Sequence, residues 1–380
     1  MFPRTLENYS AQEPSVCTAI TADIAPFLLG RSQDIVYSAE ARTLVNRKIV
    51  LVTGAGGSIG SEIVRQVRSL DPTAVYLLDH DEGALHALQL ELQGHGLLTD
   101  PFVLLADIRD AGTMRRILAE IRPDIVFHAA AHKHLPLLER FPAEGVKANV
   151  EGTQNVVAAA VEAGAELVVN ISTDKAAHPT SVLGATKRVA ENIAASYATE
   201  LTRVASVRFG NVLGSRGSLL TSLRWQVANA NDITVTDPAV TRFFMTIPEA
   251  ATLVIEAAVL AHRGETYVLD MGRPVRILDL VQRYLEFTKA DNRIVFTGLR
   301  GGEKMHEQLV DSTIEAVGAT AHPRISRIDR PALDNAVFRA AVDGLCRAAA
   351  SASSTELLDM LWTLVEPKPV PDSALVEFVA

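Results

Sequence analysis

The chain is poor in cysteine and has no long apolar segment. Its 380 residues include two cysteines, Cys17 and Cys346, which are far apart in the sequence. They form neither a disulfide framework nor a metal-binding spacing, which is typical of a reducing compartment. The most apolar stretch, residues 250–261, is too short to span a bilayer and contains Glu256. Because the N-terminus also lacks the layout of a signal peptide, we expect a cytoplasmic protein without membrane insertion.

An excess of positive charge is also missing. Lysine and arginine number 36 against 45 aspartates and glutamates, so the net charge is −9. This charge argues against nucleic acid as the main partner, although individual loops and lysines can still bind phosphate. Apolar residues make up 48% of the chain. The length therefore allows one large α/β domain with appendages, or two domains.

Strand-like and helix-like segments alternate through the first half of the chain. The run KIVLVTGAG from Lys48 predicts a buried parallel strand, because it is continuously apolar and ends in glycines. Further strand-like runs follow, and helical stretches separate them near 82–94, 111–121, 143–163 and 184–200. We expect an α/β fold, with a Rossmann-type doubly wound parallel sheet and a smaller C-terminal substrate-binding α/β region.

The same texture predicts four parts of the chain. Residues 1–45 form an N-terminal arm, and residues 46–215 form the Rossmann domain. Residues 216–330 are mainly the substrate-binding region, with some elements returning to the Rossmann domain. Residues 331–380 carry C-terminal helices.

The segment TGAGGSIG predicts a dinucleotide site, because it follows a strand and opens a helix. Gly54 permits a tight turn, Gly57 lets the backbone approach a pyrophosphate, and Gly60 lets helix and strand pack closely. Ser58 and Ile59 lie in the helix N-terminus, whose N–H groups attract a diphosphate. The alternative is a glycine-rich turn without a ligand.

Acidic and small residues at the next strand ends extend this site. Asp79 ends the second predicted strand, where a carboxylate accepts hydrogen bonds from the adenosine ribose and repels a 2′-phosphate. This favours NAD over NADP. Asp107 and Ile108 end the third strand and are expected near the adenine, while Ala129 lets the cofactor lie close to the fourth. The alternatives are a helix N-cap for Asp79 and a turn-capping role for Asp107.

His132 and His134 raise the question of a metal. They have no third ligand at a useful spacing, so we expect no metal site.

Six motifs occur in a fixed order along the chain, namely TGAGGSIGSE, HAAAHKHLPLLE, NISTDKA, GATKR, RFGNVLGSRGS and LRGGEK. Together they resemble the extended short-chain dehydrogenase/reductase superfamily, and more narrowly its CapD-like nucleotide-sugar 4,6-dehydratases of polysaccharide biosynthesis. The resemblance spans about residues 25–365. It implies NAD(P)⁺-dependent oxidation of a UDP-sugar at C4, loss of the C5 proton and the C6 hydroxyl, and return of the hydride to C6. It also implies a homo-oligomer.

Thr173, Asp174 and Lys175 end a predicted strand at the sheet edge where ligands bind in such folds. An adjacent carboxyl and amine can provide an acid and a base, with pKa values adjusted by burial and by each other. The resemblance implies that Asp174 is the acid at C6, that Lys175 is the base at C5, and that Lys187 binds the nicotinamide ribose. The alternatives are an ordinary Asp–Lys turn on a solvated loop and a solvent-facing lysine at position 187.

A tyrosine is missing from the expected catalytic helix. The family mostly places it four residues before the helix lysine, where this chain has Leu183 and a subset of relatives has methionine. Leucine cannot exchange a proton, so the C4 hydroxyl must lose its proton to Asp174, to Lys187 or to a water relayed by Thr173. We expect an active enzyme that works without the phenol.

Separated polar residues are expected to bind the nucleotide sugar. Guanidinium groups bind diphosphates bidentately, amides offer hydrogen bonds, and a carboxylate can accept hydrogen bonds from ribose hydroxyls. The resemblance assigns this role to Asn211, Arg216, Arg242, Arg300 and Glu303. Lys133 is expected to reach the sugar or phosphate, and Gly301 replaces the family's usual proline. The alternative for each arginine is a surface salt bridge.

These expectations lead to a 4,6-dehydratase that acts on a UDP-N-acetylhexosamine, with UDP-GlcNAc as the first candidate. A nucleotide-sugar 4-epimerase or 5,6-dehydratase is the alternative enzyme, since it shares the C4 hydride step. A catalytically silent NAD-binding scaffold is the alternative outside enzymes, and Leu183 is its main support.

Overall fold

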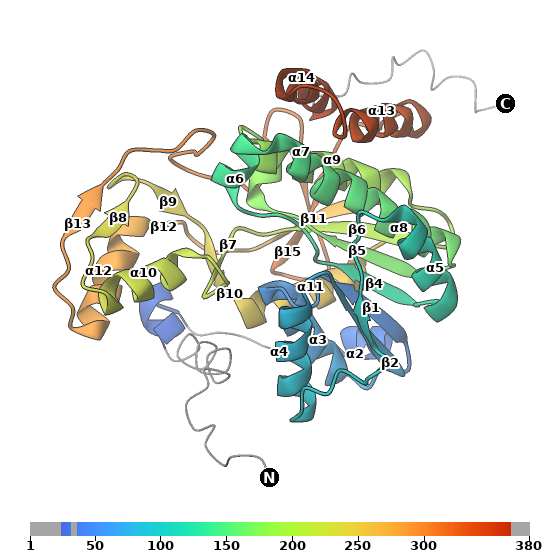
Figure 1. Cartoon of the computed structure of the whole chain (residues 1–380), viewed down its shortest axis with the longest axis horizontal. Helices are drawn as coiled ribbons and strands as arrows, with labels where there is room; N and C mark the ends of the chain where they lie inside the picture. Colours follow the sequence, from blue (N-terminus) through green and yellow to red (C-terminus); the bar gives the residue numbers. More distant parts are fainter. Residues whose placement is uncertain (1–23, 32–35, 366–380) are drawn as a thin grey trace, which may run out of the picture.

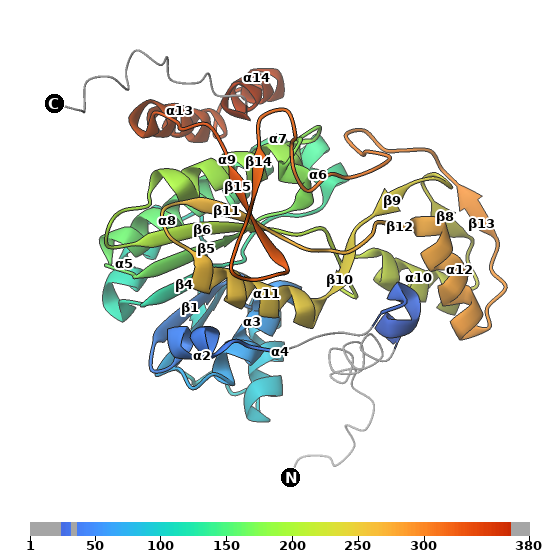
Figure 2. The ribbon, with the colours of Figure 1, turned by 180° about the vertical axis from the view of Figure 1, so that it is seen from behind.

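The computed structural model describes residues 24–31 and 36–365, and its centre is one large sheet (Figures 1 and 2). The sheet has nine strands in the order β14-β15-β11-β6-β5-β4-β1-β2-β3. In chain order they are β1 (Ile49–Thr53), β2 (Ala74–Asp79), β3 (Val103–Leu105), β4 (Ile125–His128), β5 (Leu167–Ile171), β6 (Arg203–Arg208), β11 (Glu265–Leu269), β14 (Ala316–Ala319) and β15 (Ile325–Asp329). Residues 1–23 of the predicted arm, with Cys17, and residues 366–380 of the predicted C-terminal segment lie outside the described residues.

The strands from β3 to β11 are parallel, and β15 and β14 add an antiparallel edge. Strand β1 pairs with both β2 and β4, so the strand order reverses beside it. Open α/β sheets bind ligands at the carboxyl ends of their strands at such a reversal. The prediction of a Rossmann-type doubly wound sheet is confirmed.

Helices cover both faces of the sheet because its strands are apolar on both sides. Along β1, Val50 and Val52 pack into one core cluster, while Leu51 packs into the opposite one. The first face carries α2 (Ala39–Val45), α3 (Ser58–Arg68), α4 (Glu82–Gln93) and α11 (Ile247–Leu260). The second face carries α5 (Ala111–Ile121), α8 (Gly152–Glu162) and α9 (Val182–Ser196).

Helix α9 is enclosed by a third layer of helices. All of its residues except Ala195 are buried, including polar ones such as Lys187 and Glu191. One side faces the sheet, and the other packs against the helices shown in red in Figure 1. The surrounding elements are α6 (Leu135–Arg140), α7 (Pro142–Gly145), the π-helix η1 (Val146–Glu151), α13 (Asn335–Ala348) and α14 (Ser354–Val365). A helix that is buried on all sides is held in one position by packing.

A smaller lobe stands beside the carboxyl edge of the sheet (left in Figure 1). Its core combines the helical turn at 24–29 with α10 (Leu219–Ala228) and α12 (Ile277–Thr288). This turn of the predicted arm packs against the lobe, whereas α2, at the other end of the arm, packs on the sheet. The short strands outside the large sheet are β7 (Asn211–Leu213), β8 (Ile233–Val235), β9 (Thr241–Arg242), β10 (Phe244–Thr246), β12 (Val275–Arg276) and β13 (Ile294–Phe296). The 3₁₀ turn η2 (Asp174–Ala176) follows β5 in the larger part.

The chain crosses between the two parts more than once. Strand β11 and the β14–β15 hairpin lie within the predicted substrate-binding region of 216–330, yet they pair into the large sheet. The smaller lobe is therefore assembled from separated segments. The predicted boundaries of the four parts stay a prediction.

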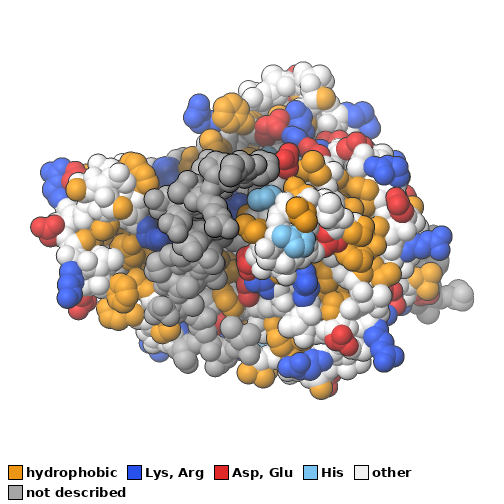
Figure 3. Space-filling model, turned by 60° about the horizontal axis from the view of Figure 1, so that its bottom comes forward, with side chains coloured by type: hydrophobic (Ala, Val, Ile, Leu, Met, Phe, Trp, Pro, Cys, Tyr) orange, Lys and Arg blue, Asp and Glu red, His pale blue; other side chains and the backbone are white. Residues whose placement is uncertain are grey.

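The surface seen in Figure 3 carries acidic and basic side chains interspersed, without one broad basic face. Among the described residues, no helix has the length and apolarity that a bilayer crossing requires.

Candidate active site

A cavity of about 1100 Å³ runs from the glycine turn along the carboxyl edge of the sheet to the smaller lobe. It brings together nearly every residue that the sequence predicted for the site. The predicted residues that line it are Gly54, Gly57, Ser58, Ile59, Gly60, Asp79, Asp107, Ile108, Ala129, Lys133, Thr173, Lys175, Lys187, Asn211, Arg216, Arg242, Arg300 and Glu303. Asp174 is fully buried directly behind the wall.

The glycines of the turn let neighbouring backbone segments pack unusually close together. Gly54 has φ +68, a conformation that side-chain-bearing residues rarely adopt. A Cβ on Gly60 would lie 2.1 Å from the carbonyl oxygen of Gly54, so the helix and the turn can meet only because Gly60 has no side chain. Helix α3 begins at Ser58 without a side-chain cap. Its first N–H groups therefore suit an anionic ligand in the cavity.

Asp79 connects the second strand to this turn. Its Oδ2 accepts a hydrogen bond from the backbone N–H of Gly56 at 2.9 Å, and its Oδ1 accepts one from Asp81 N–H at 3.1 Å. The carboxylate is held at the cavity wall in one orientation. The predicted N-capping role belongs instead to Asp81, whose side chain caps α4.

Asp107 has a partner that sequence reasoning missed. Arg109 also lines the cavity, and its Nε donates to both carboxylate oxygens of Asp107, at 3.0 and 2.9 Å. These hydrogen bonds from Arg109 lower the pKa of Asp107, although burial acts in the opposite direction. Arg109 follows Asp107 by two residues in a turn, and its backbone N–H also donates to Asp107 Oδ1 at 2.9 Å, so this short spacing was the available signal.

The loop after β4 is fixed by a side chain from the π-helix. Asn149 accepts from the N–H of His132 at 2.8 Å and donates to its carbonyl oxygen at 3.0 Å. The neighbouring Lys133 donates to the carbonyl oxygen of Arg216 at 2.6 Å, and Arg216 N–H donates to Ser58 Oγ at 3.0 Å. Sequence reasoning missed Asn149, because a π-helix leaves no clear sequence signal.

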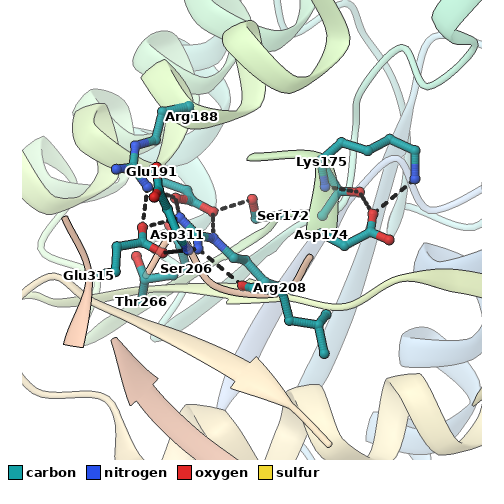
Figure 4. Close-up of polar contacts among 12 residues, drawn as sticks. Ser172, Asp174, Lys175, Arg188, Glu191, Ser206, Arg208, Thr266, Asp311 and Glu315 are labelled. Carbon is teal, nitrogen blue, oxygen red and sulfur yellow. Dashed lines mark hydrogen bonds and ion pairs between the residues drawn. The ribbon is translucent and has the colours of Figure 1, made fainter. Parts of the chain in front are cut away.

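Thr173, Asp174 and Lys175 form a hydrogen-bonded group just after β5, and Figure 4 shows Lys175 turned toward Asp174. Asp174 Oδ1 accepts from the Thr173 hydroxyl and from Lys175 Nζ, both at 2.9 Å. Lys175 Nζ also lies 3.4 Å from Asn211 Oδ1. The sequence predicted this pair, and the structure shows that Thr173 and Lys175 face the cavity while Asp174 supports both from behind.

A second carboxylate faces Lys175, and sequence reasoning missed it. Glu307 lines the cavity, and its Oε1 lies 3.8 Å from Lys175 Nζ. Burial raises the pKa of Glu307, with Asp174 adding to the rise and Lys175 opposing it. Burial alone would lower the pKa of Lys175, but Asp174 and Glu307 outweigh it and raise that pKa. Glu307 lies four residues after Glu303 in LRGGEKMHE, but this segment is not helical, so the spacing does not predict that it faces Lys175.

Lys187 and Leu183 lie one turn apart on α9 and both line the cavity. Burial lowers the pKa of Lys187 to about 8, with Glu191 opposing the shift. Among the described residues, none makes a hydrogen bond with its ammonium group. Leu183 packs with Val146, Val150 and other apolar residues, so this wall is apolar where the family usually has a phenol.

The predicted nucleotide-sugar residues converge from three segments. Arg242 Nη2 donates to Glu303 Oε1 at 2.9 Å, and Arg300 Nε donates to Glu303 Oε2 at 3.0 Å. One carboxylate thus holds two guanidinium groups at the cavity. A Cβ added at Gly301 would meet no atom within 4 Å, so the space around this residue would admit a side chain.

A separate ionic network lies behind α9 (Figure 4). Arg208 donates to both oxygens of Glu191, at 2.7 and 2.8 Å, and to both oxygens of Glu315, at 2.8 Å each. Arg188 and Arg330 complete it. The network joins α9, β6 and the segment before β14, so it fixes the helix that carries Lys187.

This sheet, turn and cavity are those of a short-chain dehydrogenase/reductase of the extended type. Residues 50–330 match the family model described as "Polysaccharide biosynthesis protein", and the chain belongs to this family. It is 46% identical over 289 residues to the probable polysaccharide biosynthesis protein EpsC of Bacillus subtilis. That match covers 75% of this chain and 48% of EpsC, so the chain spans about half the length of this relative.

Two enzymes with different names are equally similar to the chain. It is 30% identical to the UDP-N-acetylglucosamine 4,6-dehydratase (inverting) of Campylobacter jejuni, over 71% of this chain and 79% of that protein. It is also 30% identical to the UDP-glucose 4-epimerase of Rickettsia bellii, over 70% of this chain and 78% of that protein. Among solved structures, Pen from Bacillus thuringiensis has a TM-score of 0.69 at 35% identity, covering 76% of this chain and 91% of that one.

Proposed function

We propose that the chain is an NAD-dependent nucleotide-sugar 4,6-dehydratase, a lyase whose substrate is a UDP-N-acetylhexosamine such as UDP-GlcNAc. The contact between Asp174 and Lys175 at the cavity wall carries this proposal. Elimination of water across C5 and C6 needs an acid and a base close together. Epimerisation at C4 shares the hydride step, but it needs no acid and base at C5 and C6.

The residues at the glycine turn fit a dinucleotide. Its pyrophosphate can lie close to the backbone because Gly54 and Gly60 have no side chains there. The first N–H groups of α3, which no side chain caps, suit its negative charge. Asp79 would bind the adenosine ribose and disfavour a 2′-phosphate, and Lys187 would bind the nicotinamide ribose. Bound NAD⁺ supplies the acceptor for the C4 hydride and later the donor to C6.

The Thr173 hydroxyl offers the C4 proton a route that needs no tyrosine. It faces the cavity and donates to Asp174, which is itself fully buried. A proton taken from the C4 hydroxyl by Thr173 would pass on to Asp174, and the same route would deliver it to the departing C6 hydroxyl. Lys175 faces the cavity directly and would remove the C5 proton.

Basic groups along the cavity suit a nucleoside diphosphate. Lys133 donates to the backbone carbonyl oxygen of Arg216, whose N–H donates to Ser58 at the start of α3. The guanidinium groups of Arg242 and Arg300 share Glu303. Guanidinium groups that are held in place lose little freedom on binding a diphosphate. Asn211 and Glu303 would add hydrogen bonds to the sugar or ribose.

Incubation of the full chain with NAD⁺ and UDP-GlcNAc, followed by mass spectrometry, tests the proposal. We expect a product lighter by one water. An isomer of unchanged mass would instead assign a 4-epimerase, the activity in the name of the Rickettsia relative. Cofactor binding without any change in UDP-GlcNAc or a second UDP-N-acetylhexosamine would assign a silent scaffold.

A further inference from the structure

Glu307 is a buried carboxylate that is only partly satisfied. Its side chain is 3% exposed, yet it lines the cavity. Within the described part of the chain, its Oε2 has no hydrogen-bond partner. Buried carboxylate oxygens are nearly always hydrogen-bonded, so such an atom calls for a functional reason.

The groups that face Glu307 come from three segments. Lys175 and Asp174 belong to η2, and Lys175 Nζ is 3.8 Å from Glu307 Oε1. Lys304 Nζ is 3.9 Å from Oε2, but this ammonium is hydrogen-bonded to the carbonyl oxygen of His178. Arg242 on β9 adds positive charge and is already paired with Glu303. Two carboxylates, Asp174 and Glu307, thus flank the ammonium of Lys175.

Lys175 cannot remove a C5 proton while it is an ammonium ion. The two flanking carboxylates stabilise the charged form and raise its pKa. A proton acceptor next to Lys175 is therefore required before the elimination begins.

Asp174 is the more fully occupied of the two carboxylates. Its Oδ1 already receives hydrogen bonds from Thr173 and Lys175, and its Oδ2 is unpartnered among the described residues. In the same part of the chain, Glu307 accepts no hydrogen bond, and burial raises its pKa and so favours its neutral acid.

We propose that Glu307 accepts the proton of Lys175 and so prepares this lysine to act as the base at C5. The inference rests on the proposed dehydratase function. Glu307 acts through Lys175 and is a positioning residue rather than a catalytic one. The step breaks one N–H bond of the ammonium and forms one O–H bond on the carboxylate, so an ion pair becomes a neutral pair.

The protons balance over the whole reaction. Lys175 passes its proton to Glu307, and the C4 hydroxyl passes its proton through Thr173 to Asp174. Neutral Lys175 then takes the C5 proton, and Asp174 returns its proton to the C6 hydroxyl, which leaves as water. Lys175 reprotonates C5 once C6 has received the hydride, and Glu307 then restores the proton of Lys175. No proton is gained or lost by the cluster.

The pH dependence of turnover tests this role. In the wild type, the proton moves within the cluster, so kcat for UDP-GlcNAc is flat around neutral pH. In Glu307→Gln, Lys175 must lose its proton to water. We expect kcat to fall about 100-fold at pH 7 and to recover about tenfold per pH unit as the pH rises. A profile parallel to the wild type, at any level of activity, would overturn the proposal.

Two further variants separate this role from general damage. Glu303→Gln removes a carboxylate from the same loop as Glu307. The Glu303 carboxylate is hydrogen-bonded to Arg242 and Arg300 and not to Lys175. It should raise KM and leave the shape of the pH profile unchanged. Glu307→Asp keeps the acid at a longer distance and should give an intermediate kcat with a flat profile. If Glu307→Asp shows the same pH slope as Glu307→Gln, the carboxyl group is not the proton acceptor.

A measurement without substrate keeps this inference separate from the proposed function. Acetic anhydride labels neutral amines, and mass spectrometry of the peptide with Lys175 follows its titration. Loss of Glu307 should move the labelling midpoint of Lys175 to lower pH, and an unchanged midpoint would refute their coupling. If the wild type dehydrates no UDP-N-acetylhexosamine while the midpoint still moves, the proposed function fails and the Glu307–Lys175 pairing stands.

Discussion

Two buried clusters of charged side chains lie apart in Figure 4, one around Arg208 at the end of β6 and one around Lys175 after β5. They differ in how many of their polar atoms are hydrogen-bonded. In the arginine cluster, Arg208 is hydrogen-bonded to both oxygens of Glu191 and of Glu315. In the lysine cluster, Asp174 Oδ2 and Glu307 Oε2 have no hydrogen-bond partner among the described residues. A fully satisfied network fixes the position of its elements. Buried polar atoms that lack a hydrogen-bond partner beside a cavity indicate groups that gain a partner or a proton during a reaction.

The lysine cluster should control turnover most strongly. Changing Lys175→Gln removes the proposed base, and we expect kcat with UDP-GlcNAc to fall about 10³–10⁴-fold. Lys304→Gln is the matched control, since Lys304 also lies beside Glu307 but does not line the cavity. Steady-state kinetics should show a much smaller loss there. Equal losses in both variants would mean that positive charge alone, rather than proton transfer, is what the cluster supplies.

The arginine cluster should control stability. Arg208→Met leaves Glu191 and Glu315 buried without their main partner, which costs about 3–5 kcal/mol of unfolding free energy. Denaturant unfolding measures this loss, and the folded fraction should retain its kcat. Arg327→Gln removes an arginine from an exposed pair with Asp329 and should leave the unfolding midpoint unchanged. A stable Arg208→Met protein with a lost kcat would reverse the assignment of the two clusters.

Lys187, buried on α9 at the cavity, links pH to stability. Its pKa of about 8 in the folded state is below the ordinary value of 10.5. The unfolded chain therefore binds more protons between these values, and stability rises with pH across the window by about 3 kcal/mol. Unfolding curves from pH 7 to 10.5 measure this slope, which should disappear in Lys187→Met. An identical slope in both proteins would show that other groups cause it.

Position 183 should matter least. We expect Leu183→Tyr to change kcat by far less than the roughly 100-fold that a proton-transferring group contributes, because Thr173 and Asp174 already provide a route. Leu183→Met is the control of similar volume. An inactive wild type beside an active Leu183→Tyr variant would show that the phenol is required after all.

Much of the site near the glycine turn could be predicted because its determinants are local. Gly54 and Gly60 lie within one turn, and each requires the absence of a side chain. Lys175 follows Asp174 directly, so their contact needs no knowledge of the fold. The seven parallel strands were equally visible as apolar runs between glycines and polar segments, whereas the antiparallel edge of β14 and β15 was not predicted.

The residues that were missed depend on contacts between distant segments. Asn149 reaches the loop after β4 from a π-helix, and Glu307 reaches η2 from the segment after Glu303. The burial of Asp174 behind Thr173 was also not visible, because it results from how β5, η2 and the loop after β6 close over one another. No spacing in the sequence encodes these distances.

The sequence by itself determined the parallel sheet, the glycine turn and the chemical groups at the strand ends, since apolar periodicity and backbone freedom are properties of neighbouring residues. Only the tertiary structure decided which buried charged groups are fully hydrogen-bonded and which keep an oxygen without a partner. Hydrogen bonding and burial depend on what the folded chain places around each group. Glu191 is therefore paired with three arginines, while Glu307 lies near Lys175 and Lys304 and its Oε2 has no hydrogen-bond partner among the described residues.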